Sequence, residues 1–278
     1  MKKVNPVIIV FLLSMTAIFS QKLNLRMMTY NIRYASNNPG EEWDMRKDKV
    51  AEMIRFHNPD IFGVQEALQI QIDFLKDQFQ DYQQIGIARD DGKQEGEYSA
   101  LFISNKFDID TSGTFWISET PDTPSFGWDA VCRRIATWAK IIDKKSKDSL
   151  FVINTHLDHK GITARKKGVE LLMDIIQNLS NGLPIILSGD FNFTKDFEGY
   201  QYIENLGLLK DSEILAEYKY GTDISFNGFQ DNMPDKEKID FIFVSKQFKV
   251  YQHAVIGDKI KGKYPSDHMP VIVDLELN

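Results

Sequence analysis

The chain has 278 residues, with 33 Lys and Arg against 40 Asp and Glu, and a formal net charge of −7. This length is enough to bury the core of one large α/β domain. The negative balance disfavours, without excluding, nonspecific attraction to nucleic acid, because that attraction depends on Lys and Arg. Cys132 is the single cysteine, which rules out an intramolecular disulfide.

The first 20 residues have the pattern of a secretory signal peptide. Lys2 and Lys3 precede an uncharged apolar run over residues 7–19. That run is shorter than the roughly 20 residues that a membrane-spanning helix needs. A buried first strand or helix is the alternative interpretation. We expect removal of residues 1–20, export to the periplasm or the extracellular space, no membrane anchor afterwards, and a single domain over residues 21–278.

The first half of the chain alternates strands with helices and then continues as a run of strands. Apolar periodicity predicts strands over 23–32 and 60–66, each followed by a helix, over 46–57 and 70–79. Further strands are predicted over residues 82–88, 98–104, 107–117 and 135–143.

The second half begins with a strand over 150–157 and a helix over 163–179 whose leucines and isoleucines form one apolar stripe. Roughly ten strands and three or four helices, arranged in this order, fit two mixed β-sheets flanked by helices, a four-layer α/β/β/α sandwich. The remaining strands are predicted over 184–192, 239–245, 248–256 and 267–277, the last of which begins with Asp267 and His268.

Polar residues interrupt the apolar strands at their ends. Each one alone has an ordinary explanation as a turn or cap residue. Together we expect them to converge on one site, because ligand sites in α/β folds form beyond strand ends. The residues are Asn31, Glu66, His156, Asp190, Asn192, Asp240, Asp267 and His268.

Four carboxylates in one place would repel one another unless a cation shared the site. Carboxylate and amide oxygens suit Mg²⁺, with Mn²⁺ or Ca²⁺ as alternatives. Zinc is less favoured, because the candidate set holds two histidines and no cysteine. We assign His57, His159 and His253 to the surface or to packing.

Six short motifs occur in an order that resembles the endonuclease/exonuclease/phosphatase superfamily, which has the fold of deoxyribonuclease I. Residues 115–140 and 224–229 are also similar to a secreted or periplasmic bacterial subgroup. The motifs, which lie between residues 29 and 271, are TYNIR, GVQE, NTHLDH, SGDFN, IDFIFVS and SDHMPV.

The resemblance implies a metal site. Asn31 and Glu66 look like the metal-binding amide and carboxylate, with Glu66 as the principal Mg²⁺ ligand. Asp267 is similar to the residue that completes the metal shell, directly or through water. Asp158 has no counterpart among the essential positions.

The resemblance also implies catalytic roles for five residues. His268 looks like the histidine that contacts the scissile phosphate or takes the proton of the water, and Asp240 like the carboxylate that orients it. Asp190 is similar to the residue that aligns the attacking water, and Asn192 and His156 to donors for phosphate oxygens. These groups match what in-line hydrolysis of a phosphate ester requires.

The substrate is less well defined by the sequence. Arg133 and Arg134 are neighbours, so in a strand they face opposite ways, and we select Arg134 as the one that reaches the substrate. Trp116 is the candidate for an aromatic contact. The chain lacks the arginine that follows the Gly-Asp-x-Asn motif in inositol-polyphosphate phosphatases, having Thr194 and Lys195 instead.

The resulting expectation is a secreted, Mg²⁺-dependent phosphoesterase that hydrolyses a phosphodiester or phosphomonoester by metal-assisted, in-line attack of water. An extracellular nuclease acting on DNA or RNA is an alternative, and so is a sphingomyelinase-like phospholipid phosphodiesterase. A non-catalytic binding module on the same fold is the alternative of another class. No protein partner is predicted.

Overall fold

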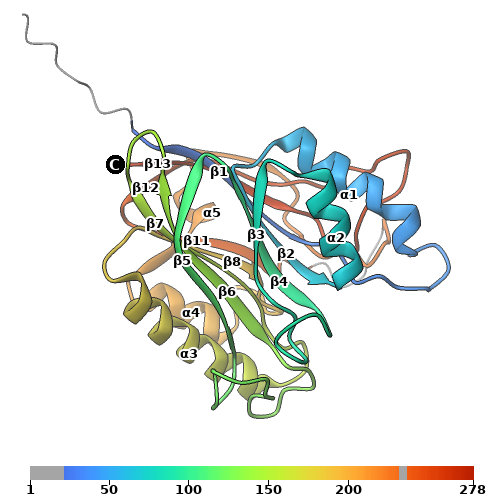
Figure 1. Ribbon diagram of the computed structural model, residues 1–278, viewed down its shortest axis with the longest axis horizontal. Coiled ribbons are helices and arrows are strands. Elements are labelled where there is room, and N and C mark those ends of the chain that lie inside the picture. Colours follow the sequence, from blue (N-terminus) through green and yellow to red (C-terminus); the bar gives the residue numbers. More distant parts are fainter. Residues whose placement is uncertain (1–21, 232–236) are drawn as a thin grey trace, which may run out of the picture.

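The computed structural model describes residues 22–231 and 237–278, and in these residues two β-sheets pack face to face with helices on their outer sides (Figure 1). The expected signal peptide over residues 1–20 lies outside the described part. Among the described residues, no helix is both long and apolar enough to cross a membrane. The predicted four-layer α/β/β/α sandwich is confirmed.

The first sheet has seven strands in the order β10-β12-β13-β1-β2-β4-β3. Two helices, α1 (Trp43–His57) and α2 (Gln69–Gln78), cover part of its outer face, where Ile54 and Ile72 join the buried cluster around Phe62. The strands are β1 (Asn24–Asn31), β2 (Ile61–Ala67), β3 (Tyr82–Ile85), β4 (Tyr98–Ser104), β10 (Tyr218–Gly221), β12 (Phe248–Val255) and β13 (Val271–Leu277).

The second sheet has six strands in the order β5-β6-β7-β8-β11-β9. Its outer face packs against α3 (Ile162–Ser180) and α4 (Glu198–Asn205), and a short helix, α5 (Ser212–Leu215), follows β9. The strands are β5 (Phe107–Trp116), β6 (Ile135–Asp143), β7 (Ser149–His156), β8 (Ile185–Asp190), β9 (Leu209–Asp211) and β11 (Asp240–Ser245).

The core between the sheets follows from the two-residue period of the strands. In β1, Met27 belongs to the cluster shared by both sheets, whereas its neighbour Met28 belongs to the cluster beneath α1 and α2. Val152 of β7 and Ile242 of β11 complete the shared cluster from the opposite side. β1 is therefore buried on both faces, which holds its C-terminal end in a fixed position.

The last strand differs from its prediction. β13 begins at Val271, so Asp267 and His268 lie in the loop that precedes it. Pro270 has no backbone N–H to donate to a ladder, and the loop instead bonds to the segment after β10: Asn227 N donates to Asp267 O at 2.7 Å, and Met269 N donates to Ser225 O at 2.7 Å. The elements α4, β9, α5 and β10 were not predicted from the sequence.

Candidate active site

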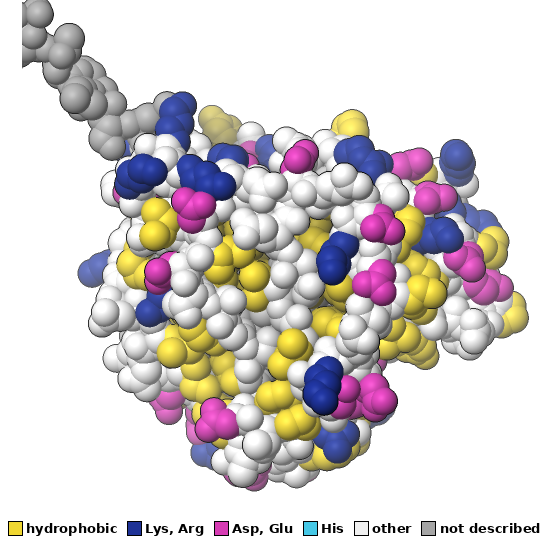
Figure 2. Space-filling view, viewed as in Figure 1, with side chains coloured by type: hydrophobic (Ala, Val, Ile, Leu, Met, Phe, Trp, Pro, Cys, Tyr) yellow, Lys and Arg dark blue, Asp and Glu magenta, His cyan; other side chains and the backbone are white. Residues whose placement is uncertain are grey.

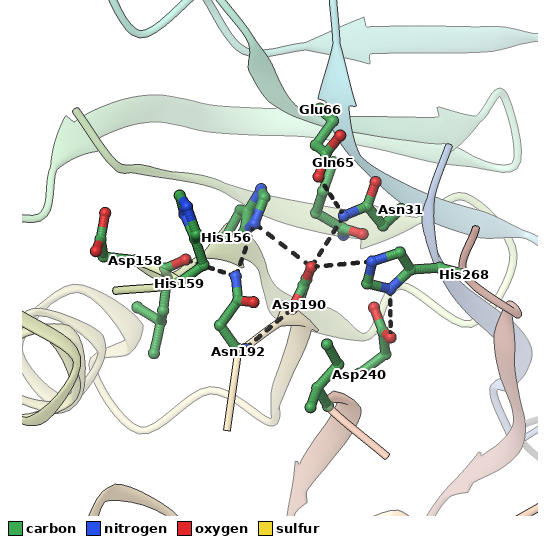
Figure 3. A network of polar contacts seen from close by, with 12 residues as sticks. Asn31, Gln65, Glu66, His156, Asp158, His159, Asp190, Asn192, Asp240 and His268 are labelled. Carbon is green, nitrogen blue, oxygen red and sulfur yellow. Dashed lines mark hydrogen bonds and ion pairs between the residues drawn. The ribbon is translucent and has the colours of Figure 1, made fainter. Parts of the chain in front are cut away.

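The polar residues at the strand ends meet at one edge of the sandwich (Figure 3). β1 and β2 are parallel, with Asn31 and Glu66 at their C-terminal ends, while β7 and β8 are parallel and end with His156 and Asp190. β11 runs antiparallel to β8, so its first residue, Asp240, pairs with Asp190. The topology therefore brings ends of both sheets together, as expected from the sequence.

His268 lies between two buried carboxylates. Its Nδ1 is 2.8 Å from Asp240 Oδ2, and its Nε2 is 3.7 Å from Asp190 Oδ2. Burial opposes a charge on this imidazole, but Asp240 and Asp190 outweigh burial and raise the pKa of His268 to about 10. The arrangement is that of an imidazolium held in one orientation by Asp240.

Asp190 is the centre of the hydrogen-bond network. Asn31 Nδ2 donates to its Oδ2 at 2.9 Å, the backbone N of Asn192 donates to its Oδ1 at 3.0 Å, and His156 Nε2 is 3.4 Å from Oδ2. Burial, together with the charge of Asp240, raises the pKa of Asp190 to about 7. A carboxylate with these properties is suited to exchange a proton near neutral pH.

His156 and Asn192 form a pair beside Asp190. Asn192 Nδ2 donates to His156 Nε2 at 2.9 Å and to the carbonyl oxygen of Leu157 at 3.0 Å. Burial, and then the charge of Arg134, hold the pKa of His156 well below its ordinary value, so the imidazole is neutral. Asn192 has a left-handed backbone, with φ 51°, which turns its side chain back towards His156.

Gly189 allows β7 and β8 to approach at this point. A Cβ added to Gly189, whose φ is +152°, would lie 2.2 Å from the carbonyl oxygen of Thr155. The glycine of the SGDFN motif is therefore a requirement of backbone packing, and it sets the position of Asp190 next to His156.

Glu66 sits in an irregularity of β2. The register with β4 shifts between Val64 and Ala67, and Glu66 has φ 62°, an uncommon backbone conformation for a residue with a side chain. Its side chain accepts from Asn31 Nδ2 at 3.1 Å and from the backbone N of Tyr34 at 3.2 Å. Strain of this kind at the end of a strand is typical of functional sites, where it re-aims a side chain.

Arg33 lies between the carboxylates of Glu66 and Asp267. Its Nη1 is 3.6 Å from Glu66 Oε2 and its Nε is 3.6 Å from Asp267 Oδ2, so neither contact is a close ion pair. Burial favours neutral carboxyls here and raises the pKa of Asp267, whereas His268, Asn31 and Arg33 overcome burial and lower the pKa of Glu66.

These oxygen donors fit a hard divalent cation, because one guanidinium only partly neutralises two buried carboxylates. Asn31 could add its amide oxygen, which accepts from the backbone N of Arg33 at 3.0 Å. Among the described residues, two groups have potential ligand atoms within 4.8 Å of one another: Cys132, Asp158 and His159 form one, and Asp190, Asp240 and His268 form the other. In the second group both carboxylates face the imidazole of His268, so we interpret Asp190, Asp240 and His268 as a proton relay.

The site opens into a cavity of about 590 Å³. Its wall includes His268, Asp190 and Glu66, and also groups that the sequence did not single out. These additional lining residues include Arg33, Tyr34, Arg89, Glu97, Cys132 and His159.

The two predicted substrate-binding residues have different positions. Arg134 lines the cavity, is 5 % exposed, and donates from Nη2 to His159 Nδ1 at 3.0 Å. Trp116 is 4 % exposed and is not among the lining residues of the described cavity. Its indole N–H donates to the carbonyl oxygen of Arg89 at 2.7 Å. A direct contact of Trp116 with substrate therefore finds no support, and Trp116 instead positions the loop that carries Arg89.

His159 was assigned to the surface or to packing; its side chain is exposed, and it also lines the cavity. Its place at the end of the NTHLDH motif was the available signal.

Asp158 has a structural role, because its Oδ1 accepts from the backbone N of Lys160 at 2.9 Å and from that of Gly161 at 2.7 Å. Arg89 and Glu97 belong to a loop without a motif, so no pattern in the sequence pointed to them.

Two of the solved structures similar to this chain share its fold and more than a third of its sequence. An endonuclease/exonuclease/phosphatase family protein from Bacteroides thetaiotaomicron is 38 % identical, with a TM-score of 0.89 over 93 % of this chain and 99 % of that one. A mannosyl-6-phosphatase from the same organism is 39 % identical, with a TM-score of 0.86 over 90 % of this chain and 99 % of that one.

A curated relative, the uncharacterized protein L388 of Acanthamoeba polyphaga mimivirus, is 28 % identical over 84 % of this chain and 92 % of its own length. The sequence model described as "Endonuclease/Exonuclease/phosphatase family" matches residues 28–268, which include all the site residues discussed above. The chain therefore belongs to the endonuclease/exonuclease/phosphatase family, whose members are metal-dependent enzymes that hydrolyse phosphate esters.

Proposed function

We propose that this protein is an exported, Mg²⁺-dependent phosphoesterase that cleaves its substrate by in-line attack of water. The observation that carries the proposal is the position of His268, whose imidazole lies 2.8 Å from Asp240 and 3.7 Å from Asp190 at the rim of the cavity that Glu66 also lines. The cavity is thus lined by a charged hydrogen-bond donor, His268, a carboxylate, Asp190, and a candidate metal ligand, Glu66.

Each residue of the rim has a role in this proposal. Asp190 aligns the attacking water, and His268, oriented by Asp240, contacts the scissile phosphate or takes the proton of the water. Asn192 and His156, which lie beside Asp190, contact the phosphate oxygens, for which Asn192 Nδ2 exchanges one of its two bonds, to His156 or to Leu157 O. Asp190 is held by Asn31 and by the backbone N of Asn192, so its orientation does not depend on the substrate.

Glu66, Asp267 and the amide of Asn31 are the proposed Mg²⁺ ligands. All three offer oxygen atoms, and Arg33 leaves the two carboxylates only partly neutralised. A bound Mg²⁺ would polarise a phosphoryl oxygen and stabilise the negative charge of the leaving alkoxide.

A small, soluble phosphate ester is the substrate class that the cavity favours. Its volume of about 590 Å³ is in the range that holds small ligands, and its wall is mainly polar and charged. The similarity to a mannosyl-6-phosphatase supports a phosphorylated sugar among the first substrates to test. On the face shown in Figure 2, Lys and Arg are interspersed with Asp and Glu, and together with the net charge of −7 this disfavours a nonspecific nuclease.

Export is proposed from the sequence of residues 1–20, in which Lys2 and Lys3 precede the apolar run. Expression in a bacterial host with and without residues 1–20, followed by fractionation, tests it. Recovery of both forms in the cytoplasm would refute export.

The proposed activity is tested with p-nitrophenyl phosphate and bis-p-nitrophenyl phosphate, in Mg²⁺ and in EDTA. We expect hydrolysis of at least one of them in Mg²⁺ and none in EDTA. The double variant Asp190→Ala/His268→Ala should be folded and inactive. An active, well-folded double variant would refute the assignment of the site, and a wild-type protein that hydrolyses no ester would refute the function.

A further inference from the structure

Arg134 is a buried cation whose hydrogen bonds are incomplete. Its Nε and Nη1 have no hydrogen-bond partner among the described residues, and only Nη2 is bonded, to His159. The nearest carboxylate oxygen, on Asp158, is 3.5 Å from Nε. That carboxylate is already shared by four backbone N–H groups, those of Val131, Cys132, Lys160 and Gly161.

An incompletely bonded guanidinium in a cavity wall is costly unless something else supplies oxygen atoms to it. Arg134 lines the cavity together with His159, and Figure 3 shows His159 on the opposite side of His156 from His268. The oxygen atoms would thus come from the part of a bound ester that extends past His156, away from His268.

Arg89 and Glu97 line the same cavity as Arg134 and His159. Arg89 Nη1 and Nη2 donate to the two oxygens of Glu97 at 2.6 and 3.0 Å, and the backbone N of Arg89 donates to the carbonyl oxygen of Glu97 at 3.1 Å. Trp116 holds this loop through the carbonyl oxygen of Arg89. The carboxylate of Glu97 is therefore fixed, and each of its oxygens retains lone-pair capacity to accept a further hydrogen bond.

The mixture of donors and acceptors decides which chemical group fits. A hydroxyl can donate to Glu97 and accept from Arg134, whereas a second anion would face the carboxylate of Glu97. We propose that Arg89, Glu97, Arg134 and His159 form a polyol subsite, which binds the hydroxyl groups of a sugar on the leaving-group side of the phosphate ester. The subsite rests on the proposed phosphoesterase function and narrows its substrate to phosphorylated sugars.

The test compares kcat/KM for mannose 6-phosphate with kcat/KM for p-nitrophenyl phosphate, whose leaving group carries no sugar hydroxyls. We expect the wild-type protein to prefer mannose 6-phosphate, and Glu97→Gln and Arg134→Met each to reduce that preference at least tenfold. Glu95→Gln and Arg133→Met are the matched controls, because their side chains do not line the described cavity. The controls should retain the wild-type preference.

A binding measurement keeps the subsite testable without turnover and covers the case in which Arg134→Met does not fold. Calorimetric titration of mannose 6-phosphate into His268→Ala protein should show binding that Glu97→Gln weakens at least tenfold and Glu95→Gln does not.

If Glu97→Gln and Arg134→Met lowered kcat/KM equally for mannose 6-phosphate and p-nitrophenyl phosphate, the polyol subsite would be refuted. It would also be refuted if the wild-type protein preferred fructose 1,6-bisphosphate to mannose 6-phosphate, because that preference would indicate a second phosphate subsite. Absence of hydrolysis of any ester would instead refute the phosphoesterase function, while the titration still decides whether the sugar binds.

Discussion

The Nδ1 atom of His268 lies 2.8 Å from Oδ2 of Asp240, although 28 residues separate the two in the chain. Asp240 is the first residue of β11, and its backbone N donates to Ser225 Oγ at 3.0 Å. His268 belongs to the loop that bonds to the same segment, since Met269 N donates to Ser225 O. One segment therefore holds both partners, and this fixes the imidazole relative to Asp190.

Asp240→Asn should reduce kcat by a factor of about 10²–10⁴, the range for general acid–base groups. The substitution keeps the shape of the side chain but removes the charge that holds His268 as an imidazolium. Steady-state kinetics with p-nitrophenyl phosphate measure the effect. Asp110→Asn, an exposed site, is the control. Activity within tenfold of wild type would contradict the role of Asp240.

Glu66→Gln should weaken Mg²⁺ binding at least tenfold, because it removes one charge from the proposed ligand set. Isothermal titration calorimetry measures the dissociation constant directly, and the rise in melting temperature with Mg²⁺ gives a second readout. Glu52→Gln, which is exposed on α1, should behave as wild type. If Glu66→Gln binds Mg²⁺ as tightly as the wild-type protein, the metal site lies elsewhere.

Arg33→Met should make the protein more dependent on Mg²⁺ for its stability. Without the guanidinium, Glu66 and Asp267 lose the cation that lies 3.6 Å from each of them, and their repulsion destabilises the metal-free protein. We therefore expect a lower melting temperature in EDTA and a larger rise on adding Mg²⁺ than in wild type. An unchanged or smaller rise would show that Arg33 does not balance these carboxylates.

Stability should decrease in acid through a cluster beside β11. Glu213 accepts from Lys195 at 2.8 Å and Lys238 at 2.5 Å, and these lysines overcome burial and lower its pKa to about 2. Burial, and then Lys238, lower the pKa of His253 to about 3. Both pKa values are lower in the folded protein, so the unfolded chain binds more protons as pH falls.

The stabilisation from His253 is present above pH ~6.5 and is lost towards pH 3, and that from Glu213 is present above pH ~4.5 and is lost towards pH 2. Glu213→Gln should lower the free energy of unfolding at pH 7 by about 2 kcal/mol, after allowance for partial exposure. It should also flatten the decrease in stability below pH 4.5. Urea unfolding at pH 7, 5 and 3 measures the free energy of unfolding of both proteins. If this free energy decreased equally with falling pH in the variant and in the wild type, the assigned role of Glu213 would be wrong.

Gly189→Ala should destabilise the protein by several kcal/mol and abolish activity. The added Cβ would lie 2.2 Å from the carbonyl oxygen of Thr155, so β7 and β8 would separate where they present His156 and Asp190. Gly207→Ala is the matched control, because Gly207 also has a positive φ of 68° but no atom within 4 Å of the added Cβ. The control should lower the free energy of unfolding by only about 1–2 kcal/mol, the cost of a left-handed backbone for a residue with a Cβ. If the two variants lowered the free energy of unfolding by similar amounts, the close approach of β7 and β8 would not be the reason for the glycine at position 189.

Much of the site was predictable because its residues stand at strand ends in a recognisable order. Asn31, Glu66, Asp190 and His268 each follow or precede an apolar run with strand periodicity, and such runs are local features of a sequence. Parallel pairing of β1 with β2, and of β7 with β8, then brings the ends of each pair together.

Other parts of the site depend on contacts that no local pattern encodes. Arg89 and Glu97 reach the cavity on a loop fixed by Trp116, a residue that the sequence suggested for substrate contact. A register shift between β2 and β4 orients the side chain of Glu66 towards the cavity. Asp267 and His268 precede β13 because their loop bonds to residues 225–228.

The sequence by itself thus determined the sandwich, the family and the candidate site residues, because strand periodicity and motif order are properties of neighbouring residues. The tertiary structure decided which loops complete the cavity and how Arg33, Arg134 and His159 are placed. Those positions result from contacts between residues distant in the chain, and their energies depend on the packing of the two sheets as a whole.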